Sequence, residues 1–176
     1  MKDCRALILV LISMWSLCQP PAALALTCTS VAAVNTWNVA ATWSGGVGNC
    51  NRIPINGADV VVSAGGTTPL NVNSNTLASL TVNGALVVGG NLNVNNTAAS
   101  PLVISNTGTV TIGNSGAARA LIVTGDITVA GTFSVGASAG THNLTAGGNV
   151  ANTGVINFAA AANRVCNVVF NDNANQ

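Results

Sequence analysis

The sequence predicts an all-β fold: a single-stranded parallel β-helix (β-solenoid), in which short strands wind into stacked coils behind an N-terminal cap that carries a disulfide. Two observations predict it. A block of alternating apolar residues and glycines recurs three times, and charged residues make up only 5% of the chain. A repeat near 20 residues with alternation inside it is typical of a solenoid of short strands.

The three blocks cover residues 80–96, 121–137 and 144–160. Each block begins with Leu, has Gly at its fifth and eleventh positions, and is apolar at its thirteenth and fifteenth positions. When the blocks are superimposed, their first residues are predicted to align in one column and their late glycines to line one corner. The aligned leucines are Leu80, Leu121 and Leu144. The corner glycines, with one from a weaker copy, are Gly90, Gly108, Gly131 and Gly154.

The first 25 residues have the pattern of a secretory signal peptide. Lys2 and Arg5 form a charged start, residues 6–17 are apolar, and residues 23–25 (Ala-Leu-Ala) fit a cleavage site. The apolar run is shorter than the roughly 20 residues that span a bilayer. Residues 1–25 are therefore expected to be removed on export, and no later segment is expected to insert into a membrane.

Residues 26–57 differ in composition from the rest and are predicted to cap the first coil. They contain both tryptophans of the exported chain, Trp37 and Trp43, and two cysteines. In an oxidising compartment Cys28 and Cys50 are the economical disulfide pair, because together they close a short loop.

Residues 58–176 are predicted to form the coils, which are expected to continue beyond residue 176. Short runs rich in Val, Ile and Leu, bounded by Gly or Asn, mark the strands. Cys166 alternates with apolar residues and is predicted to lie alone in the core; the alternative is a partner in missing sequence. An antiparallel sandwich or barrel is the rival fold. The strands are expected at residues 59–63, 77–82, 86–88, 92–94, 102–104, 110–112, 120–123, 127–129, 133–135, 155–158 and 165–170.

Charge is nearly absent after the signal peptide: no Glu and no Lys remain, and three Arg balance three Asp. Nucleic acid and anionic membranes both require clustered Lys or Arg, so neither is expected as a partner. Like charges stacked about 4.8 Å apart up a ladder would repel, whereas Asn, Thr and Ser can stack without that cost.

The residues that catalysis would need are scattered. Glycoside hydrolysis uses two carboxyl groups roughly 5–10 Å apart, but Asp59, Asp126 and Asp172 fall on different predicted coils. A surface ion pair with Arg119 would explain Asp126. His142 is the sole histidine and is expected in a solvated loop. No catalytic residue, metal ligand or cofactor is therefore predicted.

A flat polar ladder and the tryptophan end are the candidate binding surfaces. Outward Thr-x-Thr pairs resemble the arrays of some ice-binding proteins, while a solvated β face is the plainer interpretation. Trp37 and Trp43 could stack on sugar, or simply cover the end of the core. The ladder residues are Asn91, Asn93, Thr109, Thr111, Thr132 and Ser134.

The chain resembles the secreted, Gly/Asn/Thr-rich β-helix proteins of bacterial cell surfaces, of the adhesin and autotransporter-passenger type. The stretch from Trp37 through Trp43-Ser44-Gly45-Gly46 to Asp59-Val60-Val61-Val62 and the L-x-V-x-G coils carry the likeness. The resemblance implies a right-handed helix, export to the cell surface, and adhesion to host or matrix glycans or proteins, or a role as a stalk. A carbohydrate-active enzyme with catalytic coils beyond residue 176 is the alternative.

Overall fold

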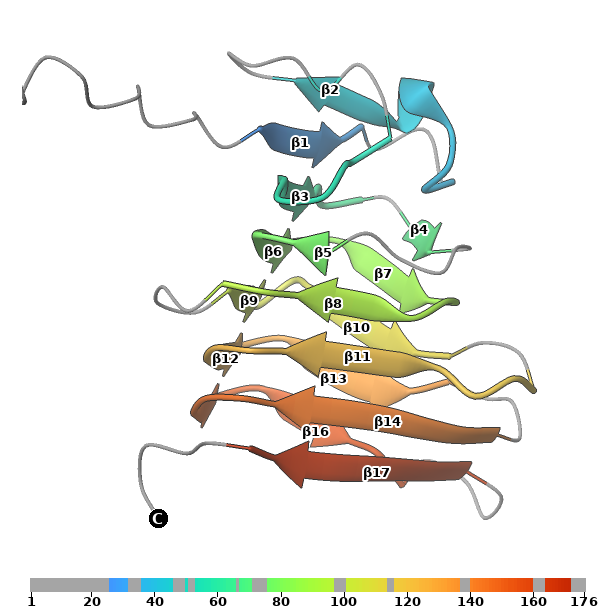
Figure 1. The fold of residues 1–176 in the computed structure, drawn as a ribbon, viewed down its shortest axis with the longest axis vertical. Helices are drawn as coiled ribbons and strands as arrows, with labels where there is room; N and C mark the ends of the chain where they lie inside the picture. Colours follow the sequence, from blue (N-terminus) through green and yellow to red (C-terminus); the bar gives the residue numbers. More distant parts are fainter. Residues whose placement is uncertain are drawn as a thin grey trace, which may run out of the picture.

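The chain is a β-solenoid, as the repeats predict (Figure 1). The predicted signal peptide, residues 1–25, lies outside the described residues. No helix in the described part of the chain is long and apolar enough to cross a membrane. The computed structural model describes residues 26–31, 36–45, 50, 53–65, 67–70, 76–96, 101–113, 116–136, 140–159 and 164–171.

Three sheets run the length of the stack, and each coil contributes one strand to each sheet, so strands β3 to β17 form five successive coils. Sheet A has the order β15 (Val150–Asn152), β12 (Ile127–Val129), β9 (Leu102–Ile104), β6 (Ser79–Val82), β3 (Asp59–Val62), β1 (Thr27–Ser30) and β2 (Trp43–Gly45). Sheet B has the order β16 (Val155–Asn157), β13 (Thr132–Val135), β10 (Thr109–Ile112), β7 (Ala85–Val88) and β4 (Thr67–Leu70). Sheet C has the order β17 (Arg164–Phe170), β14 (Gly140–Ala146), β11 (Ala120–Val123), β8 (Leu92–Val94) and β5 (Thr76–Leu77).

The core fills the space that the three sheets enclose. Successive side chains of a strand point to opposite faces, so the alternating apolar residues all turn inward. In β10, for example, Val110 and Ile112 are fully buried, while Thr109 and Thr111 face outward and are partly exposed. Because coils stack in parallel register, most buried side chains lie above another buried one. The core is continuous from the cap into the last described coil, where its residues are only partly buried.

The N-terminal cap extends sheet A over the first coil. Strand β1 pairs in parallel with β3 and antiparallel with β2. A short 3-10 turn, η2 (Ala40–Thr42), leads into β2. The Cys28–Cys50 disulfide predicted from the sequence is present, with the two Cα atoms 5.1 Å apart. The disulfide-bearing N-terminal cap that the sequence predicts is therefore present.

A column of glycines lines the corner that precedes sheet B. The amide of Thr132 donates to the carbonyl of Gly108 at 2.9 Å, and the amide of Val155 donates to that of Gly131 at 2.8 Å. A Cβ on Gly131 would collide with the carbonyl oxygen of Gly108, and one on Gly154 with that of Gly131. Glycine is required here because backbone packs directly on backbone.

The first member of this column was predicted wrongly. Gly84, whose carbonyl accepts the Thr109 amide at 2.8 Å, occupies the place expected for Gly90. Gly90 lies between β7 and β8, at another corner. In the corrected column, each glycine from Gly84 through Gly108 onward lies about one coil after the previous one.

The prediction for Leu80 is wrong because of the same shift. Leu121 pairs with Leu144, as predicted, in sheet C, but Leu80 pairs with Leu102 in sheet A. The first block was therefore aligned one side of the solenoid out of phase. The cause is that all three sides have the same pattern of alternating apolar residues ending at Gly or Asn, so the pattern does not identify the side.

Most predicted strands are present with small changes in their ends. The strand expected over residues 77–82 is divided at Ala78 into β5 and β6, because the chain turns a corner there. Strands β1 and β2 of the cap, and β4, β14 and β15 of the coils, were not expected. Pro69 lowers the strand signal of β4, and the run Gly140–Ala146 carries a histidine and few branched residues.

Within the described residues, β15, β16 and β17 form the edges of the three sheets. Phe170 and Ile156 are 65% and 37% exposed, although the register places Phe170 over buried Ala146 and Ile156 over buried Phe133. Cys166, in the same coil, is a free cysteine, as predicted, but it is only partly buried. Phe158 packs edge-on against Phe133, with ring centroids 5.1 Å apart, and covers part of the core.

Replacing Gly131 with Ala should lower the free energy of unfolding by roughly 2 kcal/mol, because the new methyl group overpacks a backbone contact. Urea denaturation measures the loss. Gly140→Ala is the matched control: its Cβ would meet the Gly116 carbonyl oxygen at 3.3 Å, which a small shift relieves. Equal losses in the two variants would contradict the corner-column assignment.

Candidate functional site

The outward face of sheet B carries two rungs of hydroxyl groups. Thr109 pairs with Thr132, and Thr111 pairs with Ser134, across β10 and β13. The Oγ1 of Thr111 and the Oγ of Ser134 lie 3.3 Å apart, within hydrogen-bond distance. We call Thr109, Thr111, Thr132 and Ser134 the Thr/Ser ladder.

Asn91 and Asn93 do not belong to this ladder, contrary to the sequence prediction. Asn93 lies in β8 of sheet C, paired with Ile122. The Asn91 side chain accepts a hydrogen bond from the Ala120 amide at 3.1 Å, also at sheet C. Their placement follows from the phase error in the first block: they lie on sheet C, one side after sheet B, where the residues with which they were aligned lie.

The ladder covers two coils, those of β10 and β13, and does not extend to the coils on either side. The corresponding positions are Ala85 and Val87 in β7, and Val155 and Asn157 in β16. Both flanking strands put an apolar residue in the columns that Thr or Ser would have to fill to extend the array. The polar face is therefore a small patch and not a long regular array.

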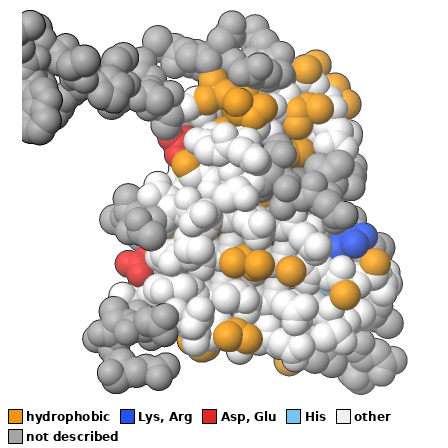
Figure 2. All heavy atoms as spheres, in the orientation of Figure 1, with side chains coloured by type: hydrophobic (Ala, Val, Ile, Leu, Met, Phe, Trp, Pro, Cys, Tyr) orange, Lys and Arg blue, Asp and Glu red, His pale blue; other side chains and the backbone are white. Residues whose placement is uncertain are grey.

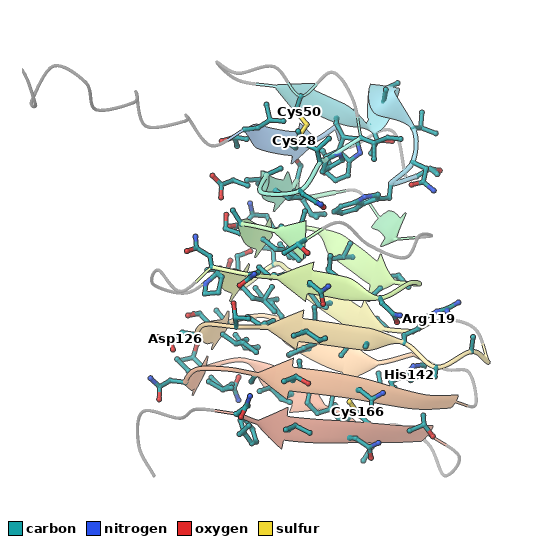
Figure 3. All side chains as sticks on the ribbon, in the orientation of Figure 1. Cys28, Cys50, Arg119, Asp126, His142 and Cys166 are labelled. Atoms are coloured by element: carbon teal, nitrogen blue, oxygen red, sulfur yellow. A yellow bond between two sulfur atoms is a disulfide. The ribbon has the colours of Figure 1, made fainter. Side chains whose placement is uncertain are left out.

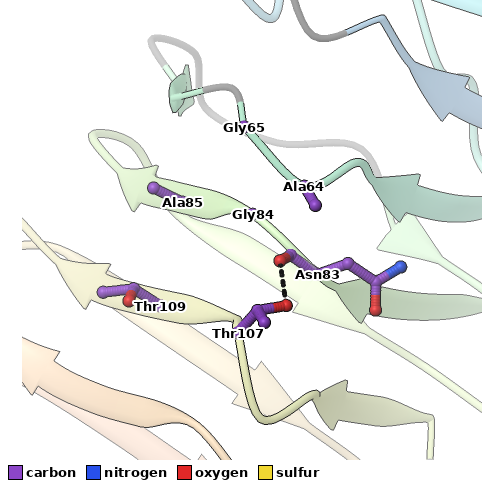
Figure 4. Close-up of a pocket in the computed structure, with 7 residues that line it drawn as sticks. All are labelled: Ala64, Gly65, Asn83, Gly84, Ala85, Thr107 and Thr109. Carbon is purple, nitrogen blue, oxygen red and sulfur yellow. Dashed lines mark hydrogen bonds between the residues drawn. The ribbon is translucent and has the colours of Figure 1, made fainter.

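A shallow groove of about 460 Å³ adjoins the ladder at the corner between sheets A and B (Figure 4). Its floor is formed mainly by small residues of three successive coils. The Thr107 hydroxyl donates a hydrogen bond to the Asn83 carbonyl at 2.8 Å, which ties two of these coils together. We call it the corner groove. Its lining residues are Ala64, Gly65, Asn83, Gly84, Ala85, Thr107 and Thr109.

Thr109 belongs to both the corner groove and the Thr/Ser ladder, so the two form one continuous surface. Sequence reasoning found the ladder but missed the groove. The signal that could have found it is the corner column itself, because Gly84 lacks a side chain at the point where three coils meet. Correct phasing of the first block was needed to use that signal.

The tryptophans are not part of an accessible binding surface. Trp37 is 1% exposed and Trp43 is 2% exposed. Their rings meet edge to face with centroids 4.7 Å apart, and the Trp43 Nε1–H donates to the Trp37 carbonyl at 2.8 Å. They form the core of the cap, the simpler of the two roles considered for them, and a sugar has no ring face to stack on.

The described acidic residues stabilise the backbone and neighbouring strands. Asp59 accepts a hydrogen bond from the Ser79 hydroxyl at 2.6 Å, and Asp126 accepts one from the backbone N–H of Asn149 at 2.8 Å. The expected ion pair between Asp126 and Arg119 is wrong, since they lie at opposite ends of β11 (Figure 3). Asp172 lies outside the described residues.

His142 was predicted in a solvated loop, and this is wrong. It lies in β14 on the inward side, with 0% of its surface exposed. Neither ring nitrogen has a hydrogen-bond partner in the described structure. Burial lowers the pKa of His142, and the nearby charge of Arg119 lowers it further. The strand β14 was missed, so the alternation that turns His142 inward with Leu144 and Ala146 was missed too.

Charge is sparse over the face of the molecule seen in Figure 2, which is mostly neither charged nor apolar. Within the described ranges, no three His, Cys, Asp or Glu side chains lie close enough together to hold a metal ion. The surface formed by the groove and the ladder can therefore offer hydroxyl, amide and backbone groups to a ligand, but little electrostatic attraction.

Comparison with known families finds a match to an established domain family. The model of the G8 domain family matches residues 42–165, from the end of η2 into the start of β17. No curated protein and no solved structure matches the chain. The match to a domain of extracellular type and the disulfide together indicate an extracellular protein.

Replacing Asp126 with Ala should lower the free energy of unfolding by about 1 kcal/mol, because the backbone N–H of Asn149 loses the carboxylate oxygen that accepts its hydrogen bond. Asp126→Asn keeps an acceptor oxygen and should lose less. Thermal or urea denaturation of the two variants gives the comparison. If Asn were as damaging as Ala, the negative charge itself would be what the corner requires.

Proposed function

The chain belongs to the G8 domain family, and from this premise we propose that it is a non-catalytic, adhesive segment of a bacterial cell-surface protein. The observation that carries the proposal is the continuous surface formed by the corner groove and the Thr/Ser ladder. Thr109 joins the two parts, and neither part contains a charged side chain. The likeness to surface adhesins seen in the sequence supports the same role.

The chemistry of this surface favours a surface glycan without charge as the ligand. Sugar hydroxyls can exchange hydrogen bonds with the Thr109 and Thr132 hydroxyls and with the exposed backbone around Gly65. The small side chains of Ala64 and Ala85 let an extended chain approach the floor of the groove. Contacts of this kind are individually weak in water, so an adhesive segment would depend on several of them acting together.

The placement of the ionisable groups supports a non-catalytic role. Asp59 belongs to the first coil and Asp126 to the corner between β11 and β12. His142 is enclosed in the core, where a substrate does not reach it. Glycoside hydrolysis requires two carboxyl groups facing one another across the bond to be cut, and the described acids are instead used in hydrogen bonds to the protein.

The regular stacking of the coils supports a structural role as well. Strands β3 to β17 form five coils that stack in parallel along three sheets. A segment of this form can serve as part of a stalk that holds a binding surface away from the cell. Of the alternatives, an ice-binding surface has less support, because the Thr/Ser ladder extends over the coils of β10 and β13 and not over their neighbours.

A panel of immobilised neutral and anionic polysaccharides tests the proposal directly. We expect binding to neutral chains that changes by less than about twofold between low and high salt, because screening acts on charges that this surface lacks. The double variant Thr109→Val/Thr132→Val should weaken binding roughly tenfold through the loss of two hydroxyl contacts.

Thr81→Val is the matched control, because Thr81 also faces outward in a strand but on sheet A. It should bind as the unchanged protein does. An equal loss in the control, a steep dependence on salt, or turnover of any polysaccharide by the purified chain would each overturn the proposal.

A further inference from the structure

We propose that His142 makes the C-terminal coils sensitive to mild acid, so that uptake of one proton by its buried ring loosens β14 and β17 from the rest of the stack. This device is independent of the adhesive function proposed above. It follows from the placement of a single buried side chain and from the strands that enclose it.

The ring of His142 is held between coils without a polar partner. It is fully buried, and neither nitrogen accepts or donates a hydrogen bond in the described structure. A neutral imidazole tolerates such a site at some cost, whereas an imidazolium has two N–H donors and a positive charge to satisfy. Protonation therefore strongly favours conformations in which the ring reaches water.

Gly113 shows how closely the ring is enclosed. It has a φ of +75°, and a Cβ there would lie 2.6 Å from Nε2 and 2.7 Å from Nδ1 of His142. The ring thus packs on the bare backbone of the corner before β11, one coil below its own. It cannot turn toward that corner to find a partner, so relief of a charged ring requires β14 to move.

The groups around the ring oppose a positive charge. Arg119 precedes β11 on the coil below, and its charge disfavours a second cation. Cys166, in register with His142 on β17, is a thiol whose pKa is raised by burial, so it stays neutral. No carboxylate of the described residues faces the ring, since Asp126 lies at the far end of β11 and Asp59 in the first coil (Figure 3).

The sign of the effect follows from linkage. The folded protein holds the pKa of His142 below the ordinary value of about 6.5, so the unfolded chain binds the proton first. The stability is complete above about pH 6.5 and falls as the pH drops from there through the lowered folded pKa. Between these two values the unfolding or opening constant rises by up to about tenfold per pH unit.

The opening should occur at the strands that enclose the ring. Strand β14 carries His142, and β17 is paired with β14 along its whole length, from Gly140↔Arg164 to Ala146↔Phe170, so β17 moves with it. The first coils lie next to the cap and its disulfide, away from the ring. Movement of β14 and β17 frees the ring while those coils keep their stacking, so the response to acid is local.

Two measurements on the full chain test this. Titration of the single imidazole by NMR should give a pKa below 6.5, and a value at or above 6.5 would overturn the proposal. Hydrogen exchange should show opening of residues 140–146 and 164–170 that increases, after correction for the intrinsic rate, from pH 7.5 to pH 5.5. Residues 80–94 should change little.

The variant His142→Leu removes the only histidine and should abolish the acid-dependent opening. The double variant Thr141→His/His142→Leu is the matched control, because it moves an imidazole to the exposed side of the same strand; it should also be insensitive to acid. If His142→Leu fails to fold, the NMR pKa and the wild-type exchange pattern still decide. Acid opening that persists in either folded variant, or that begins in the first coils, would refute the device.

Discussion

Every coil of this protein is positioned by the backbone of the coil beneath it, and this parallel stacking is the constraint on which the rest depends. At the corner column the carbonyl of Gly108 lies where a side chain on Gly131 would be. The backbone amide of Thr132 donates a hydrogen bond to the same carbonyl. With backbone packed on backbone, the chain has no freedom to slide, so apolar side chains stack on apolar ones through the whole core.

The same stacking limits which residue types can occupy the outward faces of the strands. Side chains in one column are a single strand spacing apart, so a repeated charge would be repelled by its copies. The outward faces therefore carry mostly uncharged residues, namely Thr, Ser and Asn together with some Val and Ile such as Ile122 and Val155. The described acids are used singly, each in a hydrogen bond to the next coil. A binding surface built under this constraint is polar and neutral. It gains affinity from shape and hydrogen bonds and little from long-range attraction.

Two features depart from a uniform stack of coils. In the N-terminal cap, β1 and β2 extend sheet A, and two buried tryptophans and a disulfide close the core. In β14, His142 is fully buried and neither ring nitrogen has a hydrogen-bond partner in the described structure. This buried histidine is the feature that most distinguishes the solenoid from a uniform stack.

The sequence by itself determined the fold class, the cap, the disulfide and most of the strands. Alternation and recurring glycines are local properties of the chain, and Cys28 and Cys50 are close neighbours along it. Only the tertiary structure decided which side of the solenoid each strand joins. Leu80, Asn91 and Gly90 were assigned to the wrong side because all three sides have one pattern. The corner groove was hidden for the same reason, because it depends on which coils lie against each other, and stacking, not the local pattern, fixes that. The buried site of His142 was hidden for a different reason: the sequence signal of β14 was too weak to show the alternation that turns His142 inward.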